Sequence, residues 1–453
     1  MSTFLFARRS LSLDVLLHLL LMLLSHWVAV LVEPLAVPTP ANKKSQNVPK
    51  PTLVQHDIVY TDKGIMSLAL LPPLNNNEKQ ERKILAGTKR GTLVEFAWDP
   101  VAQSCTCQGE IIHTNHASEK STSIPYPIYS LQVFDNKYNN NKLQIFCGSG
   151  DRYIKVMEST STSIESSDDG ENDDPWHFTQ QLGPHTGWVK ALAMDNDEEE
   201  EQPWLHSIGC NCIETWKQQQ SSEERWTHCT KRSIESSPNH GSTLSSDLLC
   251  LVTWNGFLCA GGVDGRIHVW PSHPEPLLSS IGAHQGRVNA LAILPTTASA
   301  SCMLLSTGHD GELQCRMLRT GKQPILLTDQ PVATLAVVDH DGAPLRISSL
   351  ACTPLQLSED KNTTARILLG TTNGLVVNAI LRNTDNQQWT VTEQSRVQLQ
   401  DDGQNDLDPI ATISVNAIEI LSPPHQQQQE EPVCAALVGH SKGLSVIHLH
   451  HQR

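Results

Sequence analysis

The chain has 453 residues, of which 48 are acidic and 33 basic, and its formal net charge is −15. This charge argues against nonspecific nucleic-acid binding, which depends on neutralising phosphates with Lys and Arg, so no nucleic-acid partner is expected. Length alone predicts about three domains, but the repeats described below predict one large domain instead.

A basic start and a long apolar run open the chain. Arg8 and Arg9 precede an apolar stretch over residues 11–32, and residues 15–32 contain no Asp, Glu, Lys or Arg. This order is typical of a signal peptide, and the run is also near the lower limit for a membrane-spanning helix. We interpret residues 1–36 as a signal peptide or a signal-anchor, with membrane contact only through residues 11–32 if the segment is uncleaved. The remaining alternative is a misassigned start codon or an untargeted extension.

This segment favours an endomembrane, secreted or organellar location over the alternative of cytoplasm or nucleus. Residues 37–51 follow as a Pro-rich basic linker. A glycosylation sequon at Asn362 matters only if the domain is lumenal.

A five-residue phrase then returns along the chain: any residue, a branched apolar residue, any residue, a small residue and an apolar residue. Six copies begin at residues 64, 127, 188, 287, 346 and 414, and a weaker seventh copy is Leu248–Leu251. Each copy precedes two apolar runs joined by a polar turn, most clearly over residues 257–270, and this is a hairpin signal.

The second positions of the phrase recur at intervals of 39 to 68 residues. Four-stranded units of about 40–45 residues are the period of propeller blades, and the longer intervals hold polar inserts. We therefore predict an all-β, seven-bladed β-propeller over residues 52–453. The expected blades lie near residues 64–113, 126–182, 187–232, 247–281, 286–330, 346–393 and 413–449, the last together with 52–60.

The last predicted blade has only three strands, because residues 450–453 are too few to add another. Residues 52–60 form a predicted strand before the first blade. Pairing this N-terminal strand with the last blade closes the ring and protects its edges.

Several repeated polar residues resemble the WD40-repeat family, of which the chain looks like a divergent member. His185, Ser207, Asn211 and Trp216 are similar to the family's His, Ser/Thr, Asp and Trp network within one blade, with Asn211 in place of Asp. Partial copies of the network are His284 with Ser306 and Asp310, Asp264 with Trp270, and Asp151. The resemblance covers roughly residues 52–450 and implies that these residues brace strands through buried hydrogen bonds.

The resemblance also implies which residues surround the narrow top face: the first and third positions of the phrase and the residue before the turn Asp. The first positions are Gly64, Pro127, Trp188, Leu248, Arg287, Arg346 and Ser414. The third positions are Met66, Tyr129, Lys190, Cys250, Asn289, Ser348 and Asn416. The turn positions include Lys89, Gly150, Cys210, Val263 and His309. None of these residues is acidic, although the chain is acidic overall.

From these sets we predict a partner-binding surface. Its members are Trp188, Lys190, Arg287, Arg346, Tyr129, His309, Asn289 and Lys89. Aromatic residues and Arg are the usual anchors of interfaces, and Arg binds carboxylate or phosphate in a bidentate manner. The predicted function is a non-catalytic scaffold, a monomeric propeller within a complex, whose top face binds an acidic or phosphorylated peptide of a partner protein.

Three alternatives stay open. In the first, the top face is an ordinary solvated rim. In the second, the protein is a cytosolic or nuclear adaptor subunit of a multiprotein complex. Adaptors of cullin-based ligases often carry Trp-Asp-x-Arg after the third strand, and this motif is absent after Trp216 and Trp270. The third alternative is a propeller enzyme, such as a hydrolase, with its site at the channel mouth.

The sequence contains no phosphate-binding Gly-rich loop, no His-Glu-x-x-His and no nucleophile elbow. We therefore predict no catalytic residue, no cofactor and no metal. The 12 cysteines are scattered, and most fall inside predicted strands, where Cys packs as a small hydrophobe. The acidic runs 168–174 and 195–201 are predicted to be solvated loops.

Overall fold

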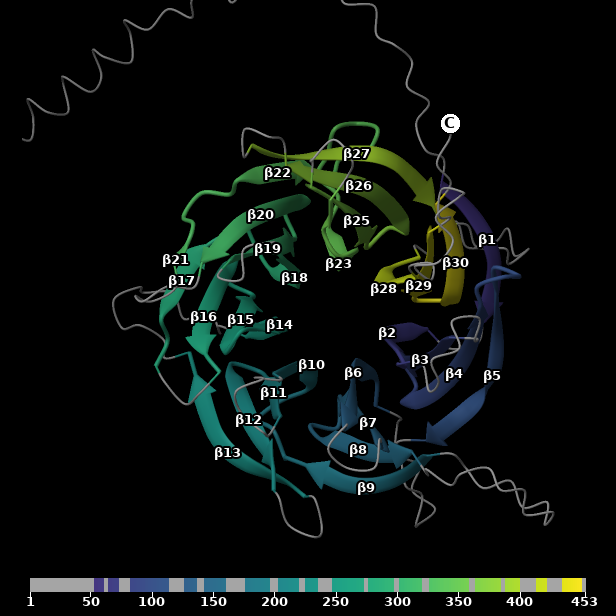
Figure 1. The fold of residues 1–453 in the computed structure, drawn as a ribbon, viewed down its shortest axis with the longest axis vertical. Helices are drawn as coiled ribbons and strands as arrows, with labels where there is room; N and C mark the ends of the chain where they lie inside the picture. The colour runs from purple at the N-terminus through teal and green to yellow at the C-terminus, as the bar shows by residue number, and fades with distance from the viewer. Residues whose placement is uncertain are drawn as a thin grey trace, which may run out of the picture. The chain divides into compact units, whose positions relative to one another are not determined.

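The computed structural model describes sixteen segments of the chain. They are residues 53–60, 64–72, 82–113, 126–136, 142–159, 176–195, 203–219, 225–234, 247–272, 276–296, 301–319, 326–357, 363–383, 388–399, 413–421 and 434–449. These segments form seven antiparallel sheets arranged around a common centre (Figure 1). The predicted all-β, seven-bladed propeller is therefore confirmed.

The first four blades each contain four strands in sequential order. Blade 1 consists of β2 (Ile65–Leu70), β3 (Arg82–Thr88), β4 (Thr92–Asp99) and β5 (Ser104–His113). Blade 2 consists of β6 (Ile128–Asn136), β7 (Lys142–Ser149), β8 (Ile154–Ser159) and β9 (Trp176–Leu182). Blade 3 consists of β10 (Val189–Asp195), β11 (Trp204–Gly209), β12 (Cys212–Gln218) and β13 (Trp226–Ser233). Blade 4 consists of β14 (Leu248–Trp254), β15 (Phe257–Gly262), β16 (Arg266–Pro271) and β17 (Ser279–Gly282).

The remaining three blades each depart from this plan in a different way. Blade 5 consists of β18 (Val288–Pro295), β19 (Ser301–Gly308) and β20 (Glu312–Arg319), with β21 (Leu326–Leu327) and β22 (Ala333–Ala336) both paired to β20. Blade 6 consists of β23 (Ile347–Cys352), β25 (Thr363–Thr371), β26 (Leu375–Asn383) and β27 (Trp389–Gln398), with the short β24 (Gln356–Leu357) beside β25. Blade 7 consists of β28 (Val415–Leu421), β29 (Cys434–His440), β30 (Gly443–Leu449) and the N-terminal β1 (Leu53–Tyr60).

The hydrophobic core is divided among the interfaces between neighbouring blades. Seven clusters of buried apolar side chains occur, and each draws its members from two adjacent blades. Between blades 2 and 3, for example, Phe146 and Val156 pack with Leu205 and Trp216. Middle strands such as β4 and β19 are therefore covered on both faces, which explains their nearly continuous apolar sequences.

The ring is closed by the N-terminal strand. β1 pairs antiparallel with β30, with a register that runs from Leu53 opposite Leu449 to Tyr60 opposite Leu444. In Figure 1 the purple β1 lies outside the yellow β30. This pairing gives blade 7 its fourth strand and satisfies the edge of β30, as predicted.

Every inner strand begins with a β-bulge at the recurring phrase. In blade 5, Val288 pairs with Gly308 and Ala290 pairs with Thr307, so Asn289 is the extra residue. The same register shift occurs at the start of all seven inner strands. A bulge leaves one residue unpaired and bends the strand. In each blade this unpaired residue is the third position of the phrase.

Polar side chains from the phrase connect each blade to the next at five of the seven junctions. At two of them the bulge residue is Asn: Asn289 Nδ2 donates to the Ile347 carbonyl at 2.6 Å, and Asn416 Nδ2 donates to the Ile65 carbonyl at 2.7 Å. At the other three the donors are Ser348 to Val415, Ser67 to Ile128 and Cys250 to Val288. In every case the acceptor is the carbonyl of the second position of the phrase in the next blade, so these contacts, from the third or fourth position, align the inner strands around the ring.

Two N-terminal predictions fall outside the described residues, namely the signal peptide or anchor (1–36) and the linker (37–51). Within the segments that the structure describes, no helix is both long and apolar enough to cross a membrane.

Deleting residues 51–60 is expected to lower the Tm sharply, by roughly 10 °C, because β30 loses its partner strand and becomes an open edge. Thermal unfolding followed by circular dichroism measures this effect. Deletion of residues 1–50 is the matched control and is expected to leave the Tm unchanged, since β1 is retained. A 51–60 deletion that unfolds like the full chain would contradict ring closure as a source of stability.

Candidate functional site

The top face is built from pairs of residues that the backbone joins in the same way in six blades. In each pair, the N–H of the turn residue between the second and third strands donates to the carbonyl of the first position of the phrase. The pairs are Lys89 with Gly64, Gly150 with Pro127, Val263 with Asp247, His309 with Arg287, Thr372 with Arg346 and Ser441 with Ser414. The first and turn positions therefore form one rim.

Blade 4 corrects the predicted rim. Leu248 pairs with Gly262 and Cys250 pairs with Gly261, as Val288 and Ala290 pair in blade 5. Leu248 is therefore the buried second position and Leu249 the bulge residue, so the first position is Asp247 and not Leu248. The prediction was wrong by one residue because the run Leu248-Leu249 offers two apolar candidates, and a slip of one residue exchanges the faces of a strand. The rim consequently contains an acidic residue.

Basic side chains gather at the junction of blades 5 and 6. Arg287 and Arg346 are exposed and come from the first positions of β18 and β23, while His309 lies in the β19–β20 turn. The partial burial of His309 and the positive charges of Arg346 and Arg287 lower the pKa of its imidazole. The structure therefore brings three of the predicted site residues together.

Aromatic side chains gather at the junction of blades 2 and 3. Tyr129 and Trp188 stack with ring centroids 5.6 Å apart and an interplanar angle of 18°. Trp188 is 53% exposed and the nearby Tyr126 is 44% exposed. Gly150 lies beneath them, since a Cβ at this position would come within 3.4 Å of the Tyr129 ring and 3.6 Å of Tyr126 Cβ. This is a second group that the structure assembles from the prediction, with Tyr126 added to it.

Three predicted residues lie in other surroundings. Lys190 and Asp247 both act on the half-buried thiol of Cys210, in opposite directions, and burial is the main reason why the pKa of this thiol is raised. An acidic residue, Asp247, therefore acts on the same thiol as Lys190. Asn289 forms the side-chain hydrogen bond between blades 5 and 6, and Lys89 is exposed in the turn of blade 1.

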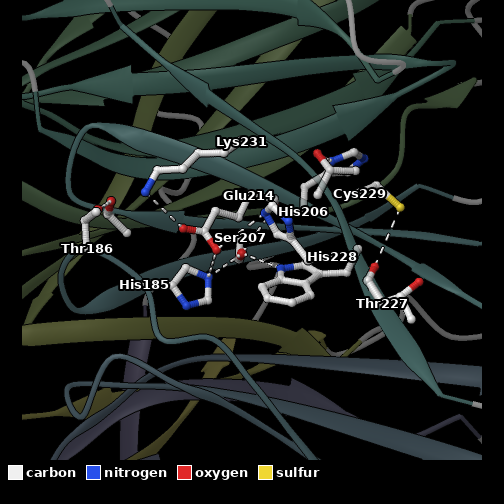
Figure 2. Close-up of polar contacts among 12 residues, drawn as sticks. His185, Thr186, His206, Ser207, Glu214, Thr227, His228, Cys229 and Lys231 are labelled. Atoms are coloured by element: carbon white, nitrogen blue, oxygen red, sulfur yellow. Dashed lines mark hydrogen bonds and ion pairs between the residues drawn. The ribbon is translucent and has the colours of Figure 1, made fainter.

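The hydrogen-bond network predicted in blade 3 is formed by His185, Ser207 and Trp216 (Figure 2). His185 Nδ1 lies 3.1 Å from the Arg152 carbonyl, which can only accept, so the ring proton resides on Nδ1. Nε2 then accepts from the Ser207 hydroxyl at 2.8 Å, and Trp216 Nε1 donates to Ser207 Oγ at 3.0 Å. Burial lowers the pKa of His185, in keeping with a neutral ring.

Asn211 does not join this network in the way predicted. In blade 5, Asp310 accepts from His284 Nδ1 at 3.0 Å, and His284 Nε2 lies 2.9 Å from Ser306 Oγ. The turn of blade 3 is one residue shorter, with four residues between the paired Ile208 and Ile213 where blade 5 has five between Thr307 and Leu313. Asn211 therefore turns to the adjacent Cys212 thiol, and the Arg152 carbonyl of blade 2 takes the place of the Asp.

The other network residues also lie in turns or behind them. Asp264 Oδ2 is 3.6 Å from His268 Nε2, and the His268 ring lies 5.7 Å from that of Trp270. In blade 2, Asp151 makes a 2.7 Å ion pair with Lys155. These contacts stay within single blades, which fits a bracing role.

Arg316 occupies the position that Trp216 has in blade 3. It is buried, and its guanidinium donates to the Thr328 carbonyl at 2.9 Å, to the Asp329 carbonyl and to Gln314 Oε1 at 2.8 Å. The two carbonyl acceptors lie in the gap between β21 and β22, so Arg316 supports the interrupted outer edge of blade 5. Burial lowers the pKa of Arg316.

Groups suited to metals or catalysis are few in the described segments. A single set of three clustered ligand-type side chains, Asp339, His340 and Asp341, lies on an exposed turn. A pocket of about 470 Å³ opens between blades 1 and 2, at the end of the ring away from the rim. It is lined by Leu70, Leu71, Pro72, Arg82, Val133 and Asp135, which include no serine, cysteine or histidine.

Replacing Ser207 with Ala is expected to cost about 3 kcal/mol of unfolding free energy, because His185 Nε2 and Trp216 Nε1 lose a partner inside the core. Urea denaturation measures the loss. Thr186→Ala is a matched control in the same blade: it removes an exposed hydroxyl that donates to the Gly209 carbonyl, and its expected cost is below about 1 kcal/mol. Equal stability of the two variants would show that the network does not brace the blade.

Comparison with known proteins identifies the fold. A crystal structure of RRP9 WD40 repeats superposes with a TM-score of 0.53 and 13% sequence identity, over 88% of this chain and 99% of that chain. A crystal structure of the Mitotic Checkpoint Complex contains a chain that matches with a TM-score of 0.51 and 12% identity, over 93% and 98% of the two chains. No protein-family model and no curated protein sequence matches. The chain therefore has a WD40-like propeller fold.

Proposed function

We propose that this protein is a non-catalytic protein-interaction scaffold whose top rim binds an acidic or phosphorylated peptide of a partner protein. The observation that carries the proposal is the grouping of Arg287, Arg346 and His309 on one rim of a chain with a net charge of −15. Neither guanidinium forms an ion pair with another described residue. Exposed guanidiniums of this kind favour carboxylate or phosphate ligands through bidentate hydrogen bonds.

The aromatic pair supports a peptide rather than a free anion as the ligand. Tyr129 and Trp188 stack at the rim, where Trp188 is exposed and Tyr129 is half-buried. Large exposed rings at a rim are typical anchors for apolar side chains of a partner. A ligand that engages both groups is therefore an extended chain that carries an acidic group and an apolar or aromatic residue.

A place in a multiprotein complex agrees with this proposal. One fold neighbour was solved as the Mitotic Checkpoint Complex. We propose a monomeric propeller that acts as one subunit. The adaptor and enzyme alternatives lack a specific observation in their favour.

Reversing the two rim arginines, Arg287→Glu together with Arg346→Glu, is expected to weaken partner capture at least about tenfold, because attraction becomes repulsion. Affinity pull-down from a native lysate with quantitative mass spectrometry measures the effect. The matched control is Arg319→Glu with Arg382→Glu, two exposed arginines on the same blades at the opposite end of β20 and β26. An identical set of partners for the rim variant and the unaltered protein would remove the proposal.

We propose further that residues 1–36 direct the protein to an endomembrane, secreted or organellar location. The apolar run of residues 15–32 is the support for this proposal. A fluorescent fusion of the full chain is expected to localise to membranes or organelles, and the same fusion without residues 1–40 is expected to be diffuse. The same distribution for both fusions would contradict a targeting role.

A further inference from the structure

Main-chain contacts fix the positions of Arg287, His309 and Arg346 at the rim between blades 5 and 6. His309 N donates to the Arg287 carbonyl at 2.9 Å, and a Cβ on Gly286 would lie 3.3 Å from His309 Cβ. Gly311, two residues after His309, has a φ of +75°, and a Cβ there would meet the backbone N and O of Leu345 at 3.0 and 2.8 Å. Leu345 therefore packs onto the turn that carries His309, and Arg346 follows directly.

A side-chain contact holds the two arginine positions in this relation. Asn289 Nδ2 donates to the Ile347 carbonyl at 2.6 Å, which joins the residue after Arg346 to the bulge two residues after Arg287. The rim positions of blades 5 and 6 are thus linked by main chain and by a half-buried amide. The two guanidinium groups are held near the His309 ring although like charges repel.

The acidic residues around these cations are engaged elsewhere. Asp310 accepts from His284 Nδ1 at 3.0 Å, from Gln285 N at 2.8 Å and from Glu312 N at 3.2 Å, so both of its oxygens face its own turn. Three acidic residues of the neighbouring elements accept hydrogen bonds of their own. Glu312 accepts from the Gln314 amide, and Glu393 accepts from the Arg396 guanidinium. Asp339 accepts from the backbone N–H groups of Asp341 and Ala343.

His309 responds to this excess of positive charge. Partial burial lowers the pKa of its ring, the charges of Arg346 and Arg287 lower it further, and Asp310 acts in the opposite direction. The ring is therefore neutral at neutral pH in the empty site. An anion between the arginines replaces this repulsion with attraction, so the pKa of His309 must rise when the anion binds. By linkage, a proton taken up on binding makes the anion bind more tightly as pH falls.

We propose that Arg287, Arg346 and His309 form one oxyanion site that takes up a proton at His309 on binding and so selects a dianionic phosphate ester over a carboxylate. This inference rests on the proposed function and specifies its ligand. Three donors that converge from two blades match the oxygens of a tetrahedral phosphate, whereas a carboxylate offers two oxygens and a single charge. The proton comes from solvent and returns there on release.

Sulfate is the probe for the test, because it is a tetrahedral dianion whose charge stays constant between about pH 5.5 and pH 8, the range in which His titrates. Sulfate is added to the full chain at constant ionic strength, and the dissociation constant is read from the NMR signals of the Arg287 and Arg346 side-chain Nε–H groups. The affinity is expected to be several-fold higher at the lower pH, up to a limit of about tenfold for a rise of about one unit in the pKa of His309. The His309 ring signals should show this rise directly.

His309→Gln removes the titrating group while leaving both arginines, so its sulfate affinity is expected to be low and independent of pH. His177→Gln, at an exposed position on the outer strand of blade 2, is the matched control and should keep the pH dependence. Sulfate binding at the arginines with equal affinity at both pH values would overturn the inference and leave the proposed function standing. Absence of any shift in the arginine signals would overturn the inference, while the pull-down with the rim variant decides the proposed function separately.

Discussion

The β-bulge at the start of each inner strand is the constraint on which the rest of the ring depends. It releases the third residue of the recurring phrase from the ladder, and in blades 5 and 7 that residue is an Asn whose amide reaches the second-position carbonyl of the next blade. A buried carbonyl without a partner is costly, so this contact specifies how far one sheet must rotate relative to the next. Repetition of the same bend seven times brings the last blade back to β1.

The same bulge separates residues that support the fold from residues that are free to vary. The second position is fully buried between blades, as in Ile65, Val288 and Ile347. The first position precedes the ladder and is joined to the turn residue by a backbone hydrogen bond in six blades, and its side chain differs from blade to blade, although Gly64 has no room for a Cβ beside the Ser441 carbonyl. This freedom explains how one architecture carries a stacked Tyr129–Trp188 pair at one junction and two exposed arginines at another.

Sequence patterns predicted the fold well because the repeated blades made their signals redundant. The His185, Ser207 and Trp216 network was also predictable, since all three residues belong to one blade and the hairpin ladder brings them together. Two predictions failed where the pattern was ambiguous by a single residue. In blade 4, the run Leu248-Leu249 allowed two alignments of the phrase, so Asp247 was not recognised as the first position. In blade 3, the shorter turn places Asn211 outside the network.

The sequence by itself determined the number of blades, the closing strand and the His185, Ser207 and Trp216 network of blade 3, because period and alternation are local properties of the chain. Only the tertiary structure decided which rim residues meet. Arg346 acts on His309 because Leu345 packs onto the turn at Gly311, and Lys190 and Asp247 both act on the Cys210 thiol. Contacts between blades depend on how neighbouring sheets pack and on the register of each bulge. A local sequence pattern does not specify which charged residues of two blades lie near each other.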